Sequence, residues 1–295
     1  ATIVGDEHAE QPMNQRIGKV ILVGAGPGDP GLLTLAGARA IAEADAIVYD
    51  ALAPSATMRH ARHGVELHYV GKRSGAHALQ QVEINALLID LASAGKRVVR
   101  LKGGDPFLFG RGAEEALACR EGGVPFEVIP GISSALAAPA FAGIPVTHRQ
   151  MAGNVLILTG HEAGEAAPTD WAFAAQAGTL VILMGAASLA ENMAHLGAAG
   201  KPSGTPVACV RWGTRPDQQV VTGTVESIAG EVARAGLTAP MAIVVGPVAS
   251  FARDLAWFEP GPLAGHRIVV TRARSDLSEL AARLEALGAF VVEAP

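Results

Sequence analysis

A glycine- and proline-rich segment follows the first apolar run of the chain and could form part of a ligand site. Residues 26–31, Gly-Pro-Gly-Asp-Pro-Gly, carry three glycines at the spacing of a dinucleotide-binding loop, and Asp50 stands where such a loop expects its ribose partner. A bound phosphate needs backbone N–H donors, which Pro27 and Pro30 lack, and the charge of Asp29 would repel it. The segment therefore predicts a loop that a ligand other than a phosphate approaches closely, and it argues against a nicotinamide-dependent dehydrogenase.

A second glycine-rich turn, Gly-Gly-Asp-Pro at 103–106, follows an apolar run at 97–101. The Asp105 carboxylate suits a cation or an amine, such as the sulfonium or ammonium of an amino-acid-like cofactor, but it equally suits the N-cap of a tight strand–helix turn. Ser133 and Ser134 leave a similar choice between capping the next helix and bonding to a ligand. Together with the first loop, these positions predict a small-molecule site.

Basic residues are bunched in the first half of the chain, although the formal net charge is −5. They form either a solvated polar face or the wall of a cleft that receives a polyanionic small molecule. The negative net charge argues against a general nucleic-acid-binding protein. The bunched residues are Arg59, His60, Arg62, His63, Lys72, Arg73, His77, Arg100, Lys102 and Arg111.

We expect a globular protein of the cytoplasm. A bilayer-spanning helix needs about 18 consecutive apolar residues, a length that no apolar run here reaches, so we expect no membrane segment. The first 16 residues do not have the pattern of a secretory signal. Cys119 and Cys209 lie in unrelated segments without metal-ligand spacing, which predicts two buried thiols in a reducing compartment and no metal site.

Short β-rich runs alternate with alanine-rich helical segments from residue 17 onward, which predicts an α/β fold with a mainly parallel N-terminal sheet. Ligands of such sheets bind beyond the carboxyl ends of the strands, where the two glycine-rich loops would lie together. We expect strands at 18–23, 46–49, 66–70, 97–101 and 126–128, and helices at 32–44, 55–62, 80–94, 111–121 and 133–142.

The pattern changes near residue 150, where we expect a domain boundary. Closely spaced runs between 206 and 225 predict antiparallel pairing, and therefore a mixed C-terminal sheet. Its expected strands are 154–159, 179–184, 206–210, 219–225 and 241–245, with helices near 188–198 and 225–235. The predicted divisions are a flexible leader at 1–16, an N-terminal α/β domain at 17–150, a C-terminal α/β domain at 151–258, and a linker with a partial strand–helix–strand unit at 259–295.

Several segments occur in an order that resembles the tetrapyrrole methylase family. They include "VGAGPGDPGLLTLAGARAI", "VGKRSG", "VVRLKGGDPFLFGRGAEE", "VIPGISSA", "GIPVTHR" and "PVACVRWGT", and the resemblance extends over about residues 17–258. The segment "HRIVVTRARSDLSELAARLEALGAFVVEAP" resembles the start of a uroporphyrinogen-III synthase domain. One position departs from the family pattern, since a bulky Trp212 precedes the Gly-Thr of "RWGT".

The resemblance implies a two-domain α/β homodimer that binds S-adenosylmethionine in the cleft between its domains. The implied reaction is the methylation of uroporphyrinogen III at carbons 2 and 7, which gives precorrin-2. Two alternatives stay open: a sister enzyme that methylates a later precorrin, and a module that binds tetrapyrroles without catalysis.

The resemblance also implies roles for individual residues. Asp50 matches a proposed proton acceptor and Lys72 a proposed proton donor, although Asp50 could instead serve as a cap or a loop ion pair. Arg111 matches an arginine that acts on the substrate; because an arginine is a poor base, we expect it to bind a substrate carboxylate, with Glu114 and Arg149 nearby. The implied cofactor contacts are Pro27, Gly103, Gly104, Asp105, Leu108, Ser133, Ser134, Met184, Gly213 and Ala242.

Overall fold

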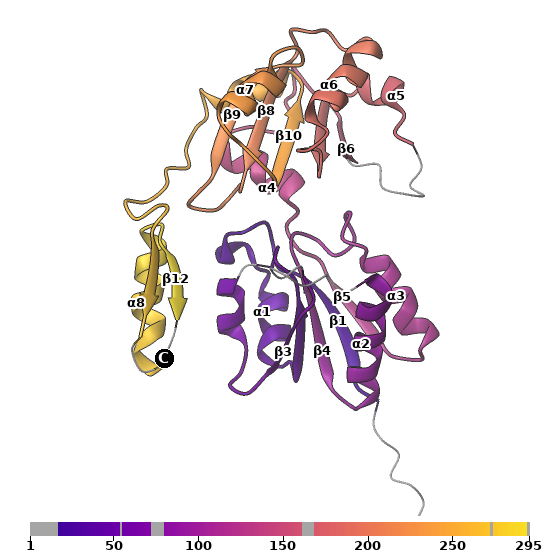
Figure 1. Cartoon of the computed structure of the whole chain (residues 1–295), viewed down its shortest axis with the longest axis vertical. Helices are drawn as coiled ribbons and strands as arrows, with labels where there is room; N and C mark the ends of the chain where they lie inside the picture. Colours follow the sequence, from indigo (N-terminus) through magenta and orange to yellow (C-terminus); the bar gives the residue numbers. More distant parts are fainter. Residues whose placement is uncertain (1–16, 54, 72–79, 161–167, 272–273, 294–295) are drawn as a thin grey trace, which may run out of the picture.

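The computed structural model describes residues 17–53, 55–71, 80–160, 168–271 and 274–293. Two α/β units lie one above the other, and a small strand–helix–strand unit lies beside the lower one (Figure 1). We refer to the unit built on the first sheet as the first domain and to that built on the second sheet as the second domain.

The sheet of the first domain is entirely parallel, as predicted. Its strands are β1 (Lys19–Gly24), β2 (Ala46–Tyr49), β3 (Glu66–Tyr69), β4 (Arg97–Lys102) and β5 (Phe126–Ile129), in the order β3-β2-β4-β1-β5. β1 lies between β4 and β5, with Val23 level with Leu101 and Ile129. The loops that follow these three strands therefore leave the same edge of the sheet.

Helices cover both faces of the first sheet because its central strands bury apolar residues on both sides. Val20 and Leu22 pack toward α2 (Gln81–Ser93) and α3 (Gly112–Glu121), whereas Ile21 and Val23 pack on the opposite side, with Ile41 of α1 (Leu35–Ala42). Two expected helices differ from the structure. The helix expected at 32–44 is the shorter α1, which begins at Leu35 because Thr34 caps it, and the 3-10 turn η1 (Pro30–Leu32) precedes it. The segment expected as a helix at 55–62 is the 3-10 helix η2 (Ser55–His60).

The sheet of the second domain is mixed, as predicted. Its order is β6-β7-β10-β8-β9, with β6 and β7 parallel and the remaining neighbours antiparallel. Two short elements, α5 and η3, were not predicted because five or six residues are too few to show helical periodicity. The elements are β6 (Val155–Thr159), α5 (Trp171–Ala175), β7 (Thr179–Leu183), α6 (Leu189–Ala198), β8 (Pro206–Arg211), β9 (Gln219–Thr224), α7 (Ile228–Arg234), β10 (Met241–Val245) and η3 (Pro247–Ala252).

Helix α4 (Ser134–Phe141) connects the two domains. It follows the loop after β5 but packs against β7, β8 and β10 of the second sheet. Ala138 of this helix and Ala142, which directly follows the helix, belong to the same buried cluster as Ala242 and Val244. The chain therefore reaches the second sheet before residue 150, where the domain boundary was expected.

The small C-terminal unit has the predicted strand–helix–strand order: β11 (Arg267–Val270), α8 (Arg274–Ala286) and β12 (Phe290–Glu293). It contacts both domains, because Arg59 of η2 pairs with Glu285 of α8, and the guanidinium of Arg215 lies 4.9 Å from the ring centroid of Phe290.

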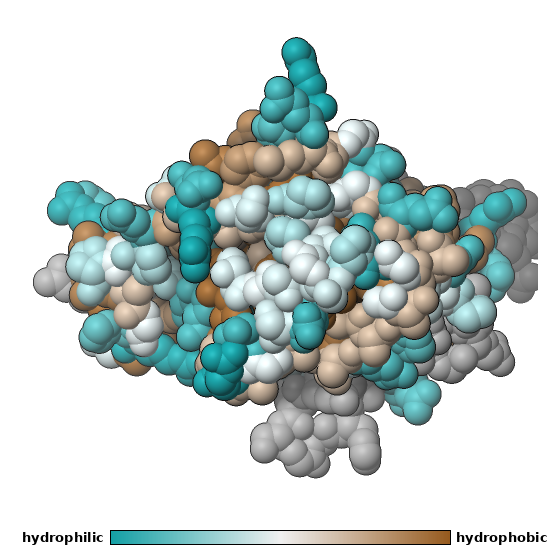
Figure 2. Space-filling model, turned by 90° about the horizontal axis from the view of Figure 1, so that it is seen from above, coloured by the Kyte–Doolittle hydropathy of each residue, from teal (hydrophilic) through white to brown (hydrophobic). Residues whose placement is uncertain are grey.

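Within the described ranges, no helix combines the length and apolar character needed to cross a bilayer. Seen from above, the molecule presents a mosaic of hydrophilic and hydrophobic residues (Figure 2).

Both cysteines are free and buried, which makes a prediction about their reactivity. Burial raises the pKa of the Cys119 thiol to about 11 and that of Cys209 to about 12. Since the thiolate is the reactive form, we expect neither thiol to react with an aromatic disulfide reagent in the folded protein at pH 8. Both should react rapidly in denaturant. Stoichiometric reaction of the folded protein within minutes would contradict the buried placement of these side chains.

Candidate active site

Three loops at the carboxyl edge of the first sheet meet backbone to backbone. Gly104 donates its N–H to the carbonyl of Gly26 at 2.7 Å, which joins the loops after β4 and β1. A Cβ on Gly131, in the loop after β5, would lie 2.2 Å from the carbonyl oxygen of Gly104. A Cβ on Gly24 would lie 2.4 Å from Cα of Gly131. Gly24 and Gly131 are therefore required by close approach, and the three loops form one continuous floor.

Asp105 joins two of these loops by hydrogen bonds. Its Oδ1 accepts the Phe107 N–H at 2.8 Å, and its Oδ2 accepts the Gly131 N–H at 3.0 Å. Both carboxylate oxygens are thus engaged by backbone donors of two different loops. Of the two roles expected from the sequence, the structure shows the turn-stabilising one, extended across to the next loop.

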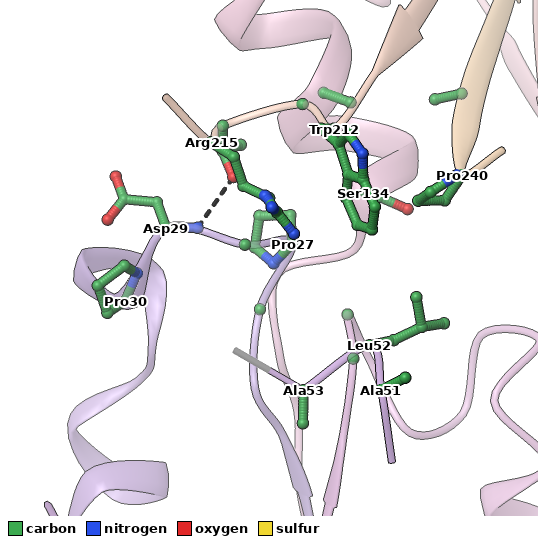
Figure 3. A pocket seen from close by; sticks show the side chains of 18 of the residues that line it. Pro27, Asp29, Pro30, Ala51, Leu52, Ala53, Ser134, Trp212, Arg215 and Pro240 are labelled. Carbon is green, nitrogen blue, oxygen red and sulfur yellow. Dashed lines mark hydrogen bonds between the residues drawn. The ribbon is translucent and has the colours of Figure 1, made fainter. Parts of the chain in front are cut away.

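A large cavity of about 1360 Å³ lies above this floor, and residues of both domains and of the C-terminal strand–helix–strand unit line it. The lining includes Asp50 and Arg111 and all the residues expected to contact a cofactor: Pro27, Gly103, Gly104, Asp105, Leu108, Ser133, Ser134, Met184, Gly213 and Ala242. In Figure 3, Pro27 and Leu52 from the first domain face Ser134, Trp212 and Pro240.

The two domains are bonded across the cavity at a point that the sequence did not reveal. The backbone N–H of Asp29 donates to the Thr214 hydroxyl at 3.0 Å (Figure 3). A Cβ on Gly28 would lie 2.6 Å from Cγ of Arg215, so the first glycine-rich loop lies directly against the loop after β8. Arg215 in turn lies 3.9 Å above the ring of Trp212, which gives the bulky residue of "RWGT" a packing partner.

A cluster of buried charges lies beside the cavity. Glu115 Oε1 accepts hydrogen bonds from Arg100 Nε at 3.1 Å and Lys102 Nζ at 2.9 Å. Arg100 also donates to Asp50 Oδ2 at 3.0 Å. Asp50, Arg100 and Lys102 line the cavity. Burial, followed by the nearby charge of Arg100, lowers the pKa of Lys102.

The bunched basic residues of the sequence therefore separate in the structure. Arg100, Lys102 and Arg111 line the cavity, whereas Arg59 pairs with Glu285 and Arg62 with Asp45. The structural importance of Arg100 and Lys102 was missed, although one signal was present. Cations two residues apart in a central strand lie on one face of the sheet and must find buried partners there.

A model of the Tetrapyrrole (Corrin/Porphyrin) Methylases matches residues 19–229, which is more than half of the chain. The chain belongs to the tetrapyrrole methylase family. The predicted family and the predicted α/β fold class are thereby confirmed.

Individual members of the tetrapyrrole methylase family are similar over most of this chain. Siroheme synthase 1 of Klebsiella pneumoniae is 49% identical over 243 residues, which cover 82% of this chain and 51% of that protein. Uroporphyrinogen-III C-methyltransferase of Bacillus subtilis is 43% identical over 286 residues, which cover 96% of this chain and 59% of that protein. The chain thus spans about half the length of the curated relatives it matches.

Solved structures of the tetrapyrrole methylase family share the fold. Uroporphyrin-III C-methyl transferase from Thermus thermophilus, complexed with S-adenyl homocysteine, has a TM-score of 0.69 and 38% identity, covering 79% of this chain and 99% of that one. Cobalt precorrin-4 methyltransferase, a cobalamin biosynthetic enzyme, has a TM-score of 0.70 and 27% identity, covering 78% of this chain and 95% of that one.

Two predicted site residues lie away from the cavity lining, and a third, Lys72, lies outside the described residues. Glu114 lies on the exposed face of α3 and forms a two-bond ion pair with Arg111, at 2.9 and 2.6 Å. This pairing lowers the pKa of Glu114 and raises that of Arg111, so both groups stay charged. Arg149 is exposed in the turn closed by His148 and Ala152.

Backbone strain is concentrated around the cavity. Five non-glycine residues of the described ranges have positive φ angles between 49° and 73°, and all five line the cavity: Phe109, Arg111, Met184, Trp212 and Thr214. Such conformations cost about 1–3 kcal/mol each and are common at ligand sites. Their shared location supports the cavity as the functional site of this tetrapyrrole methylase.

Because the three loops are in close backbone contact, we expect one added methyl group at this point to destabilise the fold strongly. We expect Gly131→Ala to lower the free energy of unfolding by about 1–3 kcal/mol, since its Cβ meets backbone that cannot yield without separating the loops. Gly230→Ala is the matched control, because Gly230 lies in α7 and a Cβ there would point into open space. Urea unfolding of both variants tests this expectation, and an equal stability of the two would contradict it.

Proposed function

We propose that this chain is an S-adenosylmethionine-dependent C-methyltransferase that converts uroporphyrinogen III to precorrin-2 by methylating carbons 2 and 7. One observation carries this proposal. The cavity of about 1360 Å³ at the carboxyl edge of the first sheet occurs in a chain that is 38% identical to a uroporphyrin-III C-methyl transferase solved with S-adenyl homocysteine. The similarity covers 99% of that enzyme's chain and 79% of this one.

The residues of the cavity fit an S-adenosyl cofactor. A Cβ on Gly104, which has a φ of +67°, would point toward Ser133 Cα at 3.8 Å, so the floor there is bare backbone that a ligand can approach. Pro27 and Leu108 add apolar surface, and a cofactor without phosphates does not need the N–H donors that Pro27 and Pro30 lack. We infer that the ten predicted cofactor residues form this binding surface.

The main catalytic task of the chain is positioning. S-adenosylmethionine supplies an electrophilic methyl group, and transfer requires the sulfur, the methyl carbon and the accepting carbon to be aligned in a site that excludes water. The accepting pyrrole carbon is electron-rich, but a proton must leave the macrocycle. We infer that Asp50 accepts this proton, because it is a carboxylate at the end of β2 that lines the cavity.

Cations around the cleft suit a substrate with eight carboxylates. Arg111 lines the cavity and is exposed, with a guanidinium that Glu114 holds by two hydrogen bonds. We infer that a substrate carboxylate replaces Glu114 on this guanidinium, since both are planar two-oxygen acceptors. Proton donation by Lys72 and a substrate contact by Arg149 stay proposals that rest on the family resemblance.

Uroporphyrinogen III is favoured over a later precorrin by sequence identity. The structural neighbour named uroporphyrin-III C-methyl transferase is 38% identical, whereas the cobalt precorrin-4 methyltransferase is 27% identical.

We also propose that the chain acts as a homodimer in the cytoplasm. The family resemblance supports the dimer, and two free, buried thiols are typical of a reducing compartment.

A methylation assay tests the proposed function. The protein is incubated anaerobically with S-adenosylmethionine and uroporphyrinogen III. The products are then oxidised, and mass spectrometry gives the number of methyl groups added to each macrocycle. We expect two methyl groups per macrocycle. No methyl transfer to uroporphyrinogen III, together with turnover of a methylated precorrin, would support the sister enzyme; binding without any turnover would support the non-catalytic module.

Asp50 provides a specific prediction within this assay. We expect Asp50→Asn to reduce kcat by about 10²- to 10⁴-fold, because an amide cannot accept the proton that leaves the macrocycle. Asp254→Asn is the control, since Asp254 is exposed and lies outside the cavity lining. A kcat for Asp50→Asn within twofold of the wild type would exclude Asp50 as the proton acceptor.

A further inference from the structure

The buried charge cluster has a geometry that the proposed mechanism does not yet use. Arg100 and Lys102 of β4 contact Glu115 of α3, and Arg100 reaches on to Asp50 at the end of β2. We propose that Arg100 is a positioning residue that fixes the Asp50 carboxylate in the cleft, and that Glu115 holds Arg100 for this task. This inference rests on the proposed function, in which Asp50 accepts a proton.

Arg100 uses its guanidinium in three directions. Nε donates to Glu115 at 3.1 Å, one terminal nitrogen donates to Asp50 at 3.0 Å, and the other donates to the Leu101 carbonyl at 3.0 Å. The side chain is only 4% exposed, so packing leaves it little freedom. The planar guanidinium of an arginine can bond to two carboxylates at a fixed separation. The ammonium group of a lysine, at the end of a flexible alkyl chain, cannot do this.

Asp50 is held at both carboxylate oxygens. Oδ1 accepts the Leu52 N–H at 3.0 Å, and Oδ2 accepts Arg100. Its side chain is 28% exposed, compared with 4% for Arg100, 6% for Lys102 and 0% for Glu115. Asp50 is therefore the member of the cluster that is most open to the cavity, and the other three form its support.

Glu115 shows that the cluster is not arranged for stability alone. Its Oε1 accepts from Arg100, Lys102 and Gln81, the last at 3.2 Å, while its Oε2 is buried without a hydrogen-bond partner among the described residues. A buried carboxylate oxygen without a partner is costly, and a buried ion network is often no more stable than an apolar replacement. The position of Glu115 is explained if its task is to hold Arg100 toward Asp50.

The two cations of the cluster are not equivalent. Burial, then the Arg100 charge, lowers the pKa of Lys102, so Lys102 loses its proton more readily than an exposed lysine does. Lys102 donates to Glu115, whereas Arg100 donates to both Glu115 and Asp50. Arg100 is therefore the cation whose hydrogen bond can fix the position of the Asp50 carboxylate.

A double-mutant cycle tests whether Arg100 acts through Asp50. Arg100→Lys, Asp50→Asn and the double variant are compared with the wild-type chain for kcat, for KM of uroporphyrinogen III, for the Kd of S-adenosylhomocysteine and for Tm. We expect Arg100→Lys to reduce kcat about tenfold or more, with KM and Kd within twofold, since orientation and not binding is lost. In the Asp50→Asn background, the same substitution should cause no further loss.

Arg97→Lys is the matched control, because Arg97 lies on the same strand but pairs with Glu43, away from the cavity lining. We expect its kcat to equal that of the wild type. Losses that multiply in the double variant, or a full kcat for Arg100→Lys, would overturn the role of Arg100.

Glu115→Gln gives an independent arm of the test if Arg100→Lys does not fold. It keeps the side-chain shape but removes the charge that holds Arg100, and we expect a reduced kcat that again disappears in the Asp50→Asn background. A folded Glu115→Gln with full kcat would overturn the proposal. A wild-type chain that transfers no methyl group would instead overturn the proposed function, and this role of Arg100 with it.

Discussion

Close backbone contact between three loops is the constraint on which the rest of this structure depends. The loops after β1, β4 and β5 meet at Gly24, Gly104 and Gly131, where a Cβ on the first or the last would collide with the backbone of a neighbour. Asp105 then ties two of these loops together through hydrogen bonds to its two carboxylate oxygens. The result is a floor made of main chain, which is suited to positioning a ligand by backbone atoms.

The second domain completes the site by resting on this floor. Helix α4 begins directly after the third loop and packs under the second sheet, so the path of the chain itself brings the two sheets together. The Asp29–Thr214 hydrogen bond joins the domains again at the first loop. Buried charges on β4 lie along one side of the resulting cleft, and strained residues from both domains surround it. Closely packed backbone below, a second domain above and the hydrogen-bonded Asp50 carboxylate at the side form an arrangement suited to aligning two reactants.

The sequence predicted the parallel first sheet, the mixed second sheet and the glycine-rich loops of the cavity, because these depend on local patterns. Leu108, Met184, Gly213 and Ala242 were assigned to the site by family resemblance, and they line the cavity. Alternating apolar runs define strands, and the glycine-rich loops follow strands that end at one edge. The Asp29–Thr214 contact could not be predicted, since it joins residues 185 positions apart whose types are common in loops. The partnership of Arg100 with Glu115 and Asp50 depends on the packing of α3 against the sheet, which periodicity does not specify. Arg149 was linked to the site only by family resemblance, and here it is exposed outside the cavity lining.

We propose that the floor formed by the three loops binds an S-adenosyl group and not a dinucleotide. Calorimetric titration of the wild type and of Asp105→Ala with S-adenosylhomocysteine, with NAD as the control ligand, measures this binding. We expect micromolar binding of S-adenosylhomocysteine and no binding of NAD. Asp105→Ala should weaken the binding, because it removes the hydrogen bonds that join two of the loops. Binding of NAD, or no binding of either compound, would contradict the proposal.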